Sequence, residues 1–131
     1  MLVIVKEPGK EPKKVDVSED LESVIGLVGG YLESVHIPSL YDMGIMVLVD
    51  DEGVLKDKSP NIVRVDRRNN VLDCLHGNVV FTGSKETIDG LEWVSLSEDQ
   101  INFLYERIFH APLKYTSNRG LVLDSVSMEL V

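Results

Sequence analysis

The chain has 131 residues, of which 44% are hydrophobic and 27% are charged, a composition typical of one globular domain. Its 13 basic and 22 acidic residues give a net charge of −9. This balance argues against sequence-independent binding to nucleic acid, which needs clustered Lys and Arg against phosphate. The simplest interpretation of the acidity is that it favours solubility. The alternative is that the acidic surface mimics nucleic acid or docks on a basic partner.

Two features of the chain predict where it resides. Cys74 is the single cysteine, so no disulfide can form within the chain and a reducing compartment is expected. The apolar run over residues 2–5 is far too short for a signal peptide or a membrane span. We therefore predict a cytoplasmic protein that does not associate with membranes.

The first 38 residues predict a hairpin, a helix and a strand in turn. The apolar run 2–5 predicts a buried strand, and Pro8-Gly9 predicts a type II turn into a half-buried strand over residues 13–17. Ser18 is the expected N-cap of a short amphipathic helix that ends at Gly29-Gly30. Alternating residues then predict a strand over 31–37, which Pro38 closes.

The middle of the chain predicts strands separated by turns. The most hydrophobic run, residues 44–50, predicts a central strand, and Asp51-Glu52-Gly53 predicts a hairpin turn into a return strand that begins at Val54-Leu55. A short strand is expected over residues 62–65. Residues 71–82 predict one long or bulged strand that is kinked at Gly77-Asn78.

The last part of the chain predicts a loop over residues 83–90, a strand over 91–96 and a second helix. Ser97 and Gln100 have the spacing of a capping box, and four apolar or aromatic residues follow at helical spacing as the expected buried stripe. The members of this stripe are Ile101, Leu104, Tyr105 and Ile108.

The order of these elements predicts an α+β fold. We expect one mainly antiparallel sheet with two short helices on one face, in the order strand-strand-helix-strands-helix. Residues 1–111 are expected to form a single α+β domain, and residues 112–131 a C-terminal extension that packs on the sheet or extends it. An extra edge strand over residues 121–131 could pair two copies of the chain into a homodimer.

Candidate reactive groups are few. Cys74 and His76 lie two apart on a predicted strand and share a face, so a thiol nucleophile is conceivable, but no third orienting group stands at a recognisable spacing. The acidic run Asp50-Asp51-Glu52 offers oxygen ligands for a metal, although a solvated hairpin turn explains it better. No catalytic residue, metal site or cofactor is therefore predicted.

A ligand site is the other candidate, because basic turns and aromatic side chains could hold a nucleotide by charge and stacking. The competing interpretation is that these are solvated turn charges and packed aromatic rings. The predicted ligand-binding residues are Tyr31, Tyr41, Arg64, Arg67, Arg68 and Trp93.

Five sequence blocks in a fixed order resemble a family of small proteins of unknown function carried by bacteriophages, plasmids and conjugative elements. The match covers about residues 3–109. Its departures from the family pattern are Asp51, the Lys58-Ser59 pair and the tail from Pro112. The blocks read VIVKEPGKEPKKVDV, LESVIGLVGGYLESV, VLVDDEGVLKDKSPN, GNVVFTG and EWVSLSEDQI.

The resemblance implies a mobile-element accessory protein in the cytoplasm of a bacterial host, and it implies no reaction. We therefore expect a non-enzymatic protein that binds a host protein and could counteract a host defence. The alternative is a protein that binds or sequesters a small nucleotide-type ligand.

Overall fold

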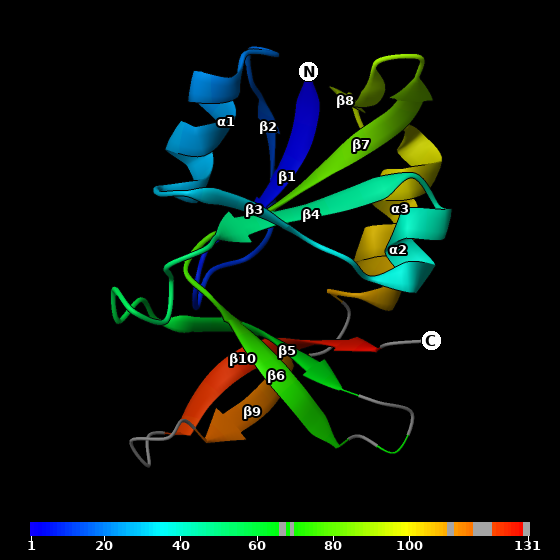
Figure 1. Cartoon of the computed structure of the whole chain (residues 1–131). Helices are drawn as coiled ribbons and strands as arrows, with labels where there is room; N and C mark the ends of the chain where they lie inside the picture. Colours follow the sequence, from blue (N-terminus) through cyan, green and yellow to red (C-terminus); the bar gives the residue numbers. More distant parts are fainter. Residues whose placement is uncertain (66–67, 69, 110–111, 117–121, 130–131) are drawn as a thin grey trace.

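The computed structural model describes residues 1–65, 68, 70–109, 112–116 and 122–129. Within these residues the chain forms strands and three short helices (Figure 1). The helices are α1 (Leu21–Val28), α2 (Pro38–Asp42) and α3 (Glu98–Arg107). The strands are β1 (Leu2–Lys6), β2 (Lys13–Asp16), β3 (Leu32–Val35), β4 (Ile45–Asp50), β5 (Pro60–Val65), β6 (Val71–His76), β7 (Val79–Thr87), β8 (Gly90–Val94), β9 (Pro112–Thr116) and β10 (Val122–Glu129).

The described strands form two sheets. Sheet A has the order β2-β1-β7-β4-β3, and β8 also pairs with β7. Sheet B has the order β6-β5-β10-β9, and its β5–β10 pair is parallel whereas the other described pairs are antiparallel. The α+β class and the mainly antiparallel pairing are thus confirmed, but the strands divide between two sheets where one was expected.

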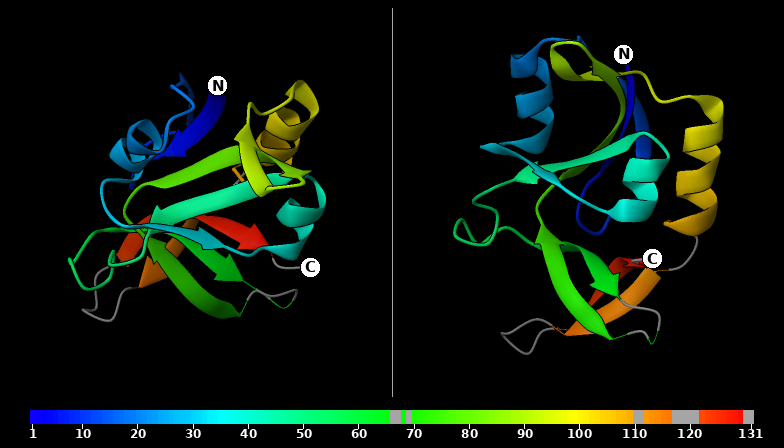
Figure 2. Two further views of the ribbon diagram at one scale, coloured as in Figure 1. Left: turned by 45° about the horizontal axis from the view of Figure 1, so that its top comes forward. Right: turned by 45° about the vertical axis from the view of Figure 1, so that its right-hand side comes forward.

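The helices cover both faces of sheet A, so the expectation of two helices on one face is wrong (Figure 2). Val3 and Val5 of β1 pack with Val24 and Val28 of α1. Ile4, between them, belongs to a second core cluster that includes residues of α2 and α3. Since side chains alternate across a strand, an interior strand with the consecutive apolar residues 2–5 needs cover on both sides.

The second core cluster also joins the two sheets. Ile62 of β5 and Leu75 of β6 are buried together with Val79 and Phe81 of β7 and with Leu104 of α3. Apolar side chains of sheet B therefore pack against those of sheet A and α3. The two sheets are parts of one packed structure in the described part of the chain.

The expected long strand over residues 71–82 is in fact two strands in different sheets. β6 belongs to sheet B and β7 to sheet A, and the chain turns between them at Gly77, where φ is +77°. This left-handed conformation is open to glycine at little cost. β7 then continues to Thr87 and pairs with β8, so the loop expected over residues 83–90 is also wrong.

Local signals at the helix ends have mixed outcomes. The capping box of Ser97 and Gln100 and the left-handed C-cap at Gly29 (φ +80°) are confirmed. Asp20, and not Ser18, caps α1, since its carboxylate accepts from the Ser23 N–H at 2.8 Å.

The structure differs from expectation at two other positions. Pro38 begins α2 where a strand was expected to end, because its fixed φ suits the first helical position. Tyr105 remains 37% exposed and its hydroxyl donates to the Pro12 carbonyl at 3.3 Å, so it is not part of the buried stripe.

The C-terminal segment contributes two strands to sheet B. β10 lies between β5 and β9, so it is an interior strand and not the edge strand that was expected. The open edge on this side of sheet B belongs to β9. None of the described helices is long and apolar enough to cross a membrane.

Two glycines, one within α1 and one at its C-cap, should respond in opposite ways to replacement by alanine. Gly29→Ala should lower the free energy of unfolding by about 1 kcal/mol, because alanine resists the left-handed cap conformation. Gly26→Ala should raise it by about 0.5–1 kcal/mol, because Gly26 lies within the helix and a Cβ there meets open space. Urea unfolding measures both, and two changes of the same sign would contradict the cap assignment.

Candidate functional site

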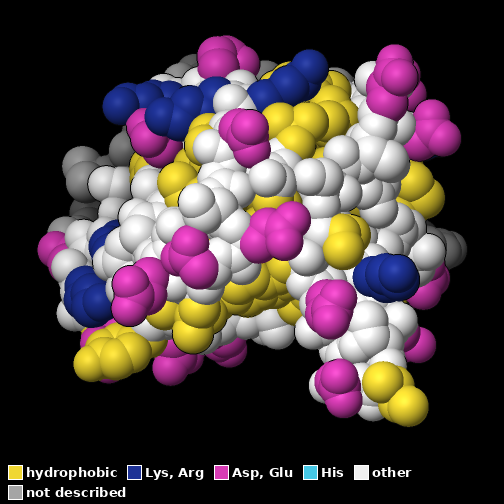
Figure 3. Space-filling model, turned by 90° about the horizontal axis from the view of Figure 1, so that it is seen from above, with side chains coloured by type: hydrophobic (Ala, Val, Ile, Leu, Met, Phe, Trp, Pro, Cys, Tyr) yellow, Lys and Arg dark blue, Asp and Glu magenta, His cyan; other side chains and the backbone are white. Residues whose placement is uncertain are grey.

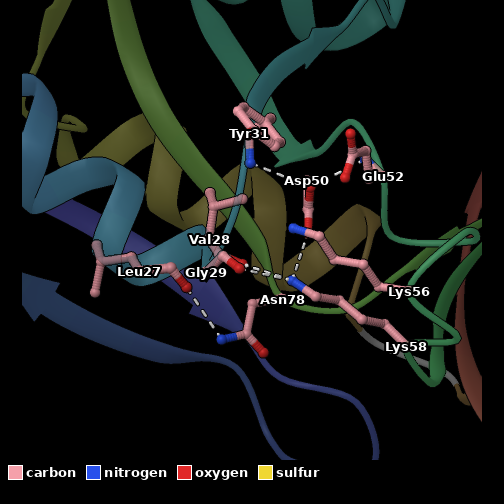
Figure 4. Close-up of polar contacts among 9 residues, drawn as sticks. All are labelled: Leu27, Val28, Gly29, Tyr31, Asp50, Glu52, Lys56, Lys58 and Asn78. Carbon is pink, nitrogen blue, oxygen red and sulfur yellow. Dashed lines mark hydrogen bonds and ion pairs between the residues drawn. The ribbon is translucent and has the colours of Figure 1, made fainter.

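The carboxylate of Asp50, at the end of β4, is a buried charge with four polar partners. It is only 4% exposed. It accepts hydrogen bonds from the backbone N–H of Tyr31 (3.2 Å) and Glu52 (3.0 Å), and it pairs with the Nζ atoms of Lys56 (3.0 Å) and Lys58 (2.7 Å) (Figure 4). Two dipoles and two cations thus replace the water that this charge loses on burial.

Lys58 also stabilises the end of α1. Its Nζ donates to the carbonyl oxygens of Gly29 (3.0 Å) and Val28 (3.4 Å), and α1 has no basic residue in its own last turn. A cation here satisfies free carbonyls and complements the negative end of the helix dipole. The Asn78 Nδ2 donates to the Leu27 carbonyl at 3.0 Å and completes this cap (Figure 4).

Close approach at this point depends on two positions without a side chain. A Cβ on Gly30 would overlap the Asp50 carboxylate, and a Cβ on Gly77 would lie 2.7 Å from the Cδ of Lys58. The Lys58 stem therefore runs along the bend between β6 and β7. These contacts connect the end of α1, the end of β4 and the crossing between the two sheets.

Burial alone would raise the pKa of the Asp50 carboxyl, but hydrogen bonds from Lys58, the Glu52 N–H and Lys56 outweigh it and hold that pKa well below its usual range. Asp50 is therefore a structural anion and not a solvated turn residue, which corrects the sequence interpretation. Residues 51–57 form successive turns, so the expected return strand at Val54-Leu55 is also wrong. Among the described residues, no three His, Cys, Asp or Glu side chains could hold a metal ion.

A second polar link joins the sheets beside this one. Asn61 is 1% exposed, and its Nδ2 donates to the carbonyls of Lys6 (2.6 Å) and Gly77 (2.7 Å). Its Oδ1 accepts from the Lys6 Nζ at 3.0 Å. Burial lowers the pKa of Lys6, and nearby Glu11 and Glu7 oppose that change. Four of the five blocks that carry the family resemblance thus contribute residues to one junction.

A surface cleft of about 420 Å³ lies between the two sheets, next to Asp50. One wall is β3 and the end of β4, and the other is β5 and β6. We call it the inter-sheet cleft. Its lining residues are Glu33, Ser34, Val35, His36, Val49, Asp50, Asp51, Gly53, Val54, Arg64, Asp73, Cys74, Leu75 and His76.

The cleft brings Cys74 and His76 together but does not activate the thiol. Burial raises the pKa of Cys74, although a hydrogen bond with the Asn61 backbone opposes it. The Nδ1 of His76 lies 2.9 Å from the Lys58 carbonyl, so that ring nitrogen is engaged with the backbone. A nucleophilic cysteine needs a lowered pKa and a base in contact, and this pair has neither in the contacts described.

The charged groups of the cleft are arranged as pairs. Arg64 of β5 forms a two-pronged ion pair with Asp73 of β6. Across the cleft, a hydrogen bond with the Asp51 side chain, helped by burial, raises the pKa of Glu33. The cleft therefore contains a neutralised pair on one wall and two adjacent carboxyl groups on the other.

The structure places the predicted ligand-binding residues in separate regions. Tyr31 is 67% exposed beside the turns after β4, with the Lys56 Nζ 5.4 Å from its ring centre. Tyr41 on α2 packs against His36, with 5.0 Å between ring centres. Trp93 of β8 packs on the core cluster that contains residues of α1.

The basic members of the predicted set are also dispersed. Arg64 lines the inter-sheet cleft, where Asp73 already pairs with it. Arg68 lies in a turn beyond β5, and Arg67 lies outside the described residues. The described members of the set do not converge on one cavity. Sequence reasoning missed Asp50 with Lys56 and Lys58, although an acid that ends a buried strand and precedes two lysines by six and eight residues was a usable signal.

Asp50→Asn should lower the free energy of unfolding by about 1–3 kcal/mol at pH 7, because the charge-assisted bonds weaken. The pKa of Asp50 is depressed in the folded state, so its stabilisation is complete above the unfolded pKa of about 3.9 and is lost as the pH falls below that value. The difference between wild type and variant should therefore shrink from about pH 5 towards pH 2. Urea unfolding across this range measures it.

The matched control for that titration is Asp89→Asn, at an exposed hairpin tip. It should leave both the stability at pH 7 and the acid dependence unchanged. A pH-independent difference between Asp50→Asn and wild type would show that the charge of Asp50 does not stabilise the fold.

Cys74 should react slowly with iodoacetamide in the native protein. Its raised pKa leaves little thiolate at pH 8, and the side chain is partly buried. Alkylation followed by mass spectrometry should be severalfold slower than for the same protein unfolded in urea. Native labelling faster than that of free cysteine would instead indicate an activated thiol.

Comparison with known proteins gives one match. Neither a curated protein nor a solved structure matches the chain. A family model, described as a domain of unknown function (DUF3846), matches residues 1–110, which include both polar links and the whole inter-sheet cleft. The chain therefore belongs to the DUF3846 family.

Proposed function

We propose that this chain is a non-enzymatic accessory protein of a mobile element and that it binds a host protein, with interference in a host defence as the purpose. The bacterial and mobile-element setting is supported by the sequence resemblance. The binding role is supported by the surface around Asp50. This surface includes the turns after β4, residues 51–59, which we call the β4–β5 loop.

The observation that carries the proposal is a pair of exposed apolar side chains on a loop whose conformation is fixed by hydrogen bonds. Val54 and Leu55 are 69% and 85% exposed at its tip. The loop is closed by hydrogen bonds from the Lys58 N–H to the Gly53 carbonyl and from the Lys56 N–H to the Glu52 carbonyl, both 2.9 Å. Exposed apolar side chains on an ordered loop lose little conformational freedom on binding, so their burial favours association.

The surroundings of the loop specify the partner's charge. Glu33, Asp51 and Glu52 lie near its base, and Tyr31 adds a largely exposed ring. Aromatic and apolar anchors within a charged rim are the usual composition of a protein-binding surface. A partner with an apolar pocket and a basic rim would be complementary to it.

The nucleotide alternative receives less support from the same region. Lys56 and Lys58 are paired with Asp50, and Arg64 is paired with Asp73. An anionic ligand would have to displace those carboxylates, and a buried carboxylate left without partners is costly.

Mimicry of nucleic acid also receives little support from the view in Figure 3. Acidic side chains are spread among uncharged atoms on this face, and the largest group of Lys and Arg side chains lies along one of its borders. A polyanion mimic needs continuous rows of negative charge. We therefore favour docking on a folded protein.

The test is capture of a partner from bacterial lysate by the tagged protein, with the captured protein then identified and purified. The double variant Val54→Ser with Leu55→Ser should weaken its binding at least tenfold, because the apolar anchors are lost. Both side chains are exposed, so the fold should be unaffected. Titration calorimetry measures the affinity.

The control is Ile88→Ser, which removes a fully exposed apolar side chain at the β7–β8 hairpin, far from the β4–β5 loop (Figure 1). It should leave binding unchanged. Equal binding by the double variant and the control would refute a role for the loop.

A further inference from the structure

The edge of sheet A at β3 is open in the described structure, because β3 pairs with β4 alone. The Asp51 N–H donates to the Tyr31 carbonyl at 2.7 Å. Hydrogen-bonded positions alternate along an antiparallel pair, so Glu33 and Val35 also direct their backbone groups to β4. The backbone groups directed to the open edge are those of Leu32 and Ser34.

The inter-sheet cleft runs along this edge. Four consecutive residues, 33–36, line it. Successive side chains of a strand point to opposite faces, so a consecutive run lines a cavity only where the cavity meets the strand at its edge. The cleft is therefore a trough beside unpaired backbone groups, which is the geometry that an added strand needs.

The edge of β6 forms the opposite wall of the cleft. It is less suited than β3 to pair with an added strand. The β5–β6 ladder shifts register between Pro60 and Ile62 and again between Arg64 and Val65. Such irregularities twist an edge and interrupt its pairing. β3 keeps an unbroken register with β4 over all four of its residues.

The charges of the trough determine which strand it accepts. Asp50 is paired with lysines and Asp73 with Arg64, so the carboxyl groups left to a ligand are Glu33 and Asp51. Glu33 is exposed and lies on the edge strand itself. Edge pairing between two copies of this chain would bring these acids together, which disfavours self-association, whereas a cation would be attracted.

We propose that the β3 edge accepts an extended segment of the partner protein as an added antiparallel or parallel strand, and that a lysine or arginine of that segment pairs with Glu33 and Asp51. This inference rests on the proposed function, because it describes how part of a protein partner is held. The backbone groups at Leu32 and Ser34 supply the affinity that is independent of sequence, and the two acids supply the preference for a basic segment.

The experiment uses a synthetic seven-residue peptide of alternating Lys and Val, titrated into the full chain and followed by backbone amide NMR. The largest shifts should fall on residues 32–36. The same peptide N-methylated at two consecutive central residues lacks a donor on each edge and should bind at least tenfold more weakly. The corresponding Glu and Val peptide should also bind at least tenfold more weakly than the Lys and Val peptide.

Variants of the protein separate the contribution of backbone hydrogen bonds to binding from the contribution of charge. Ser34→Pro removes an outward N–H that sheet A does not use, so binding should fall at least tenfold, whereas Ser34→Thr should bind normally. Glu33→Gln combined with Asp51→Asn should weaken the Lys and Val peptide by a similar factor. If Ser34→Pro fails to fold, the N-methylated peptide on the unaltered protein decides the question.

Two results would overturn the proposal. One is equal binding of the plain and N-methylated peptides, which would show attraction by charge alone. The other is a set of shifts centred away from residues 32–36. If Ser34→Pro leaves partner capture intact while the Val54 and Leu55 double variant abolishes it, docking through the loop stands and strand addition fails. If neither changes capture, the partner is held by neither surface and strand addition fails; if the unaltered protein captures no partner at all, the proposed function fails as well.

Discussion

The buried carboxylate of Asp50 is the constraint on which the rest of the structure depends. A carboxylate without partners in this position would cost several kcal/mol, so its donors must be held in place whenever the chain is folded. The donors come from Tyr31, directly before β3, and from the loop after β4. One charge thus fixes where α1 ends and how the loop leaves sheet A.

The surface that we propose for binding follows from this constraint. The lysines that neutralise Asp50 also hold the β4–β5 loop, so Val54 and Leu55 are exposed on a fixed support. Tyr31, whose N–H is bonded to the same carboxylate, directly precedes β3. Apolar anchors and an open strand edge are therefore held beside each other, which reduces the entropy that a partner must overcome.

Expectations based on local chemistry were largely confirmed. The turn at Pro8-Gly9 is closed by a hydrogen bond between Lys10 and Glu7, the cap at Gly29 is left-handed, and the box at Ser97 is complete. Expectations that required knowledge of partners often failed. Residues 83–87 become part of β7 because β8 pairs with them, and residues 71–82 divide between two sheets because β6 pairs with β5. The turn after β4 was recognised, but the burial of Asp50 was not.

The residues themselves specified the α+β class, the positions of most turns and caps, and the lack of a recognisable catalytic motif, because these depend on backbone preferences and on contacts within a few positions of the chain. The division into two sheets, the placing of helices on both faces and the meeting of Asp50 with Lys58 arise in the folded molecule. They depend on contacts between segments distant in sequence, such as Lys58 with Gly29 or Asn61 with Lys6. Only the packed chain brings such groups close enough to satisfy a buried charge.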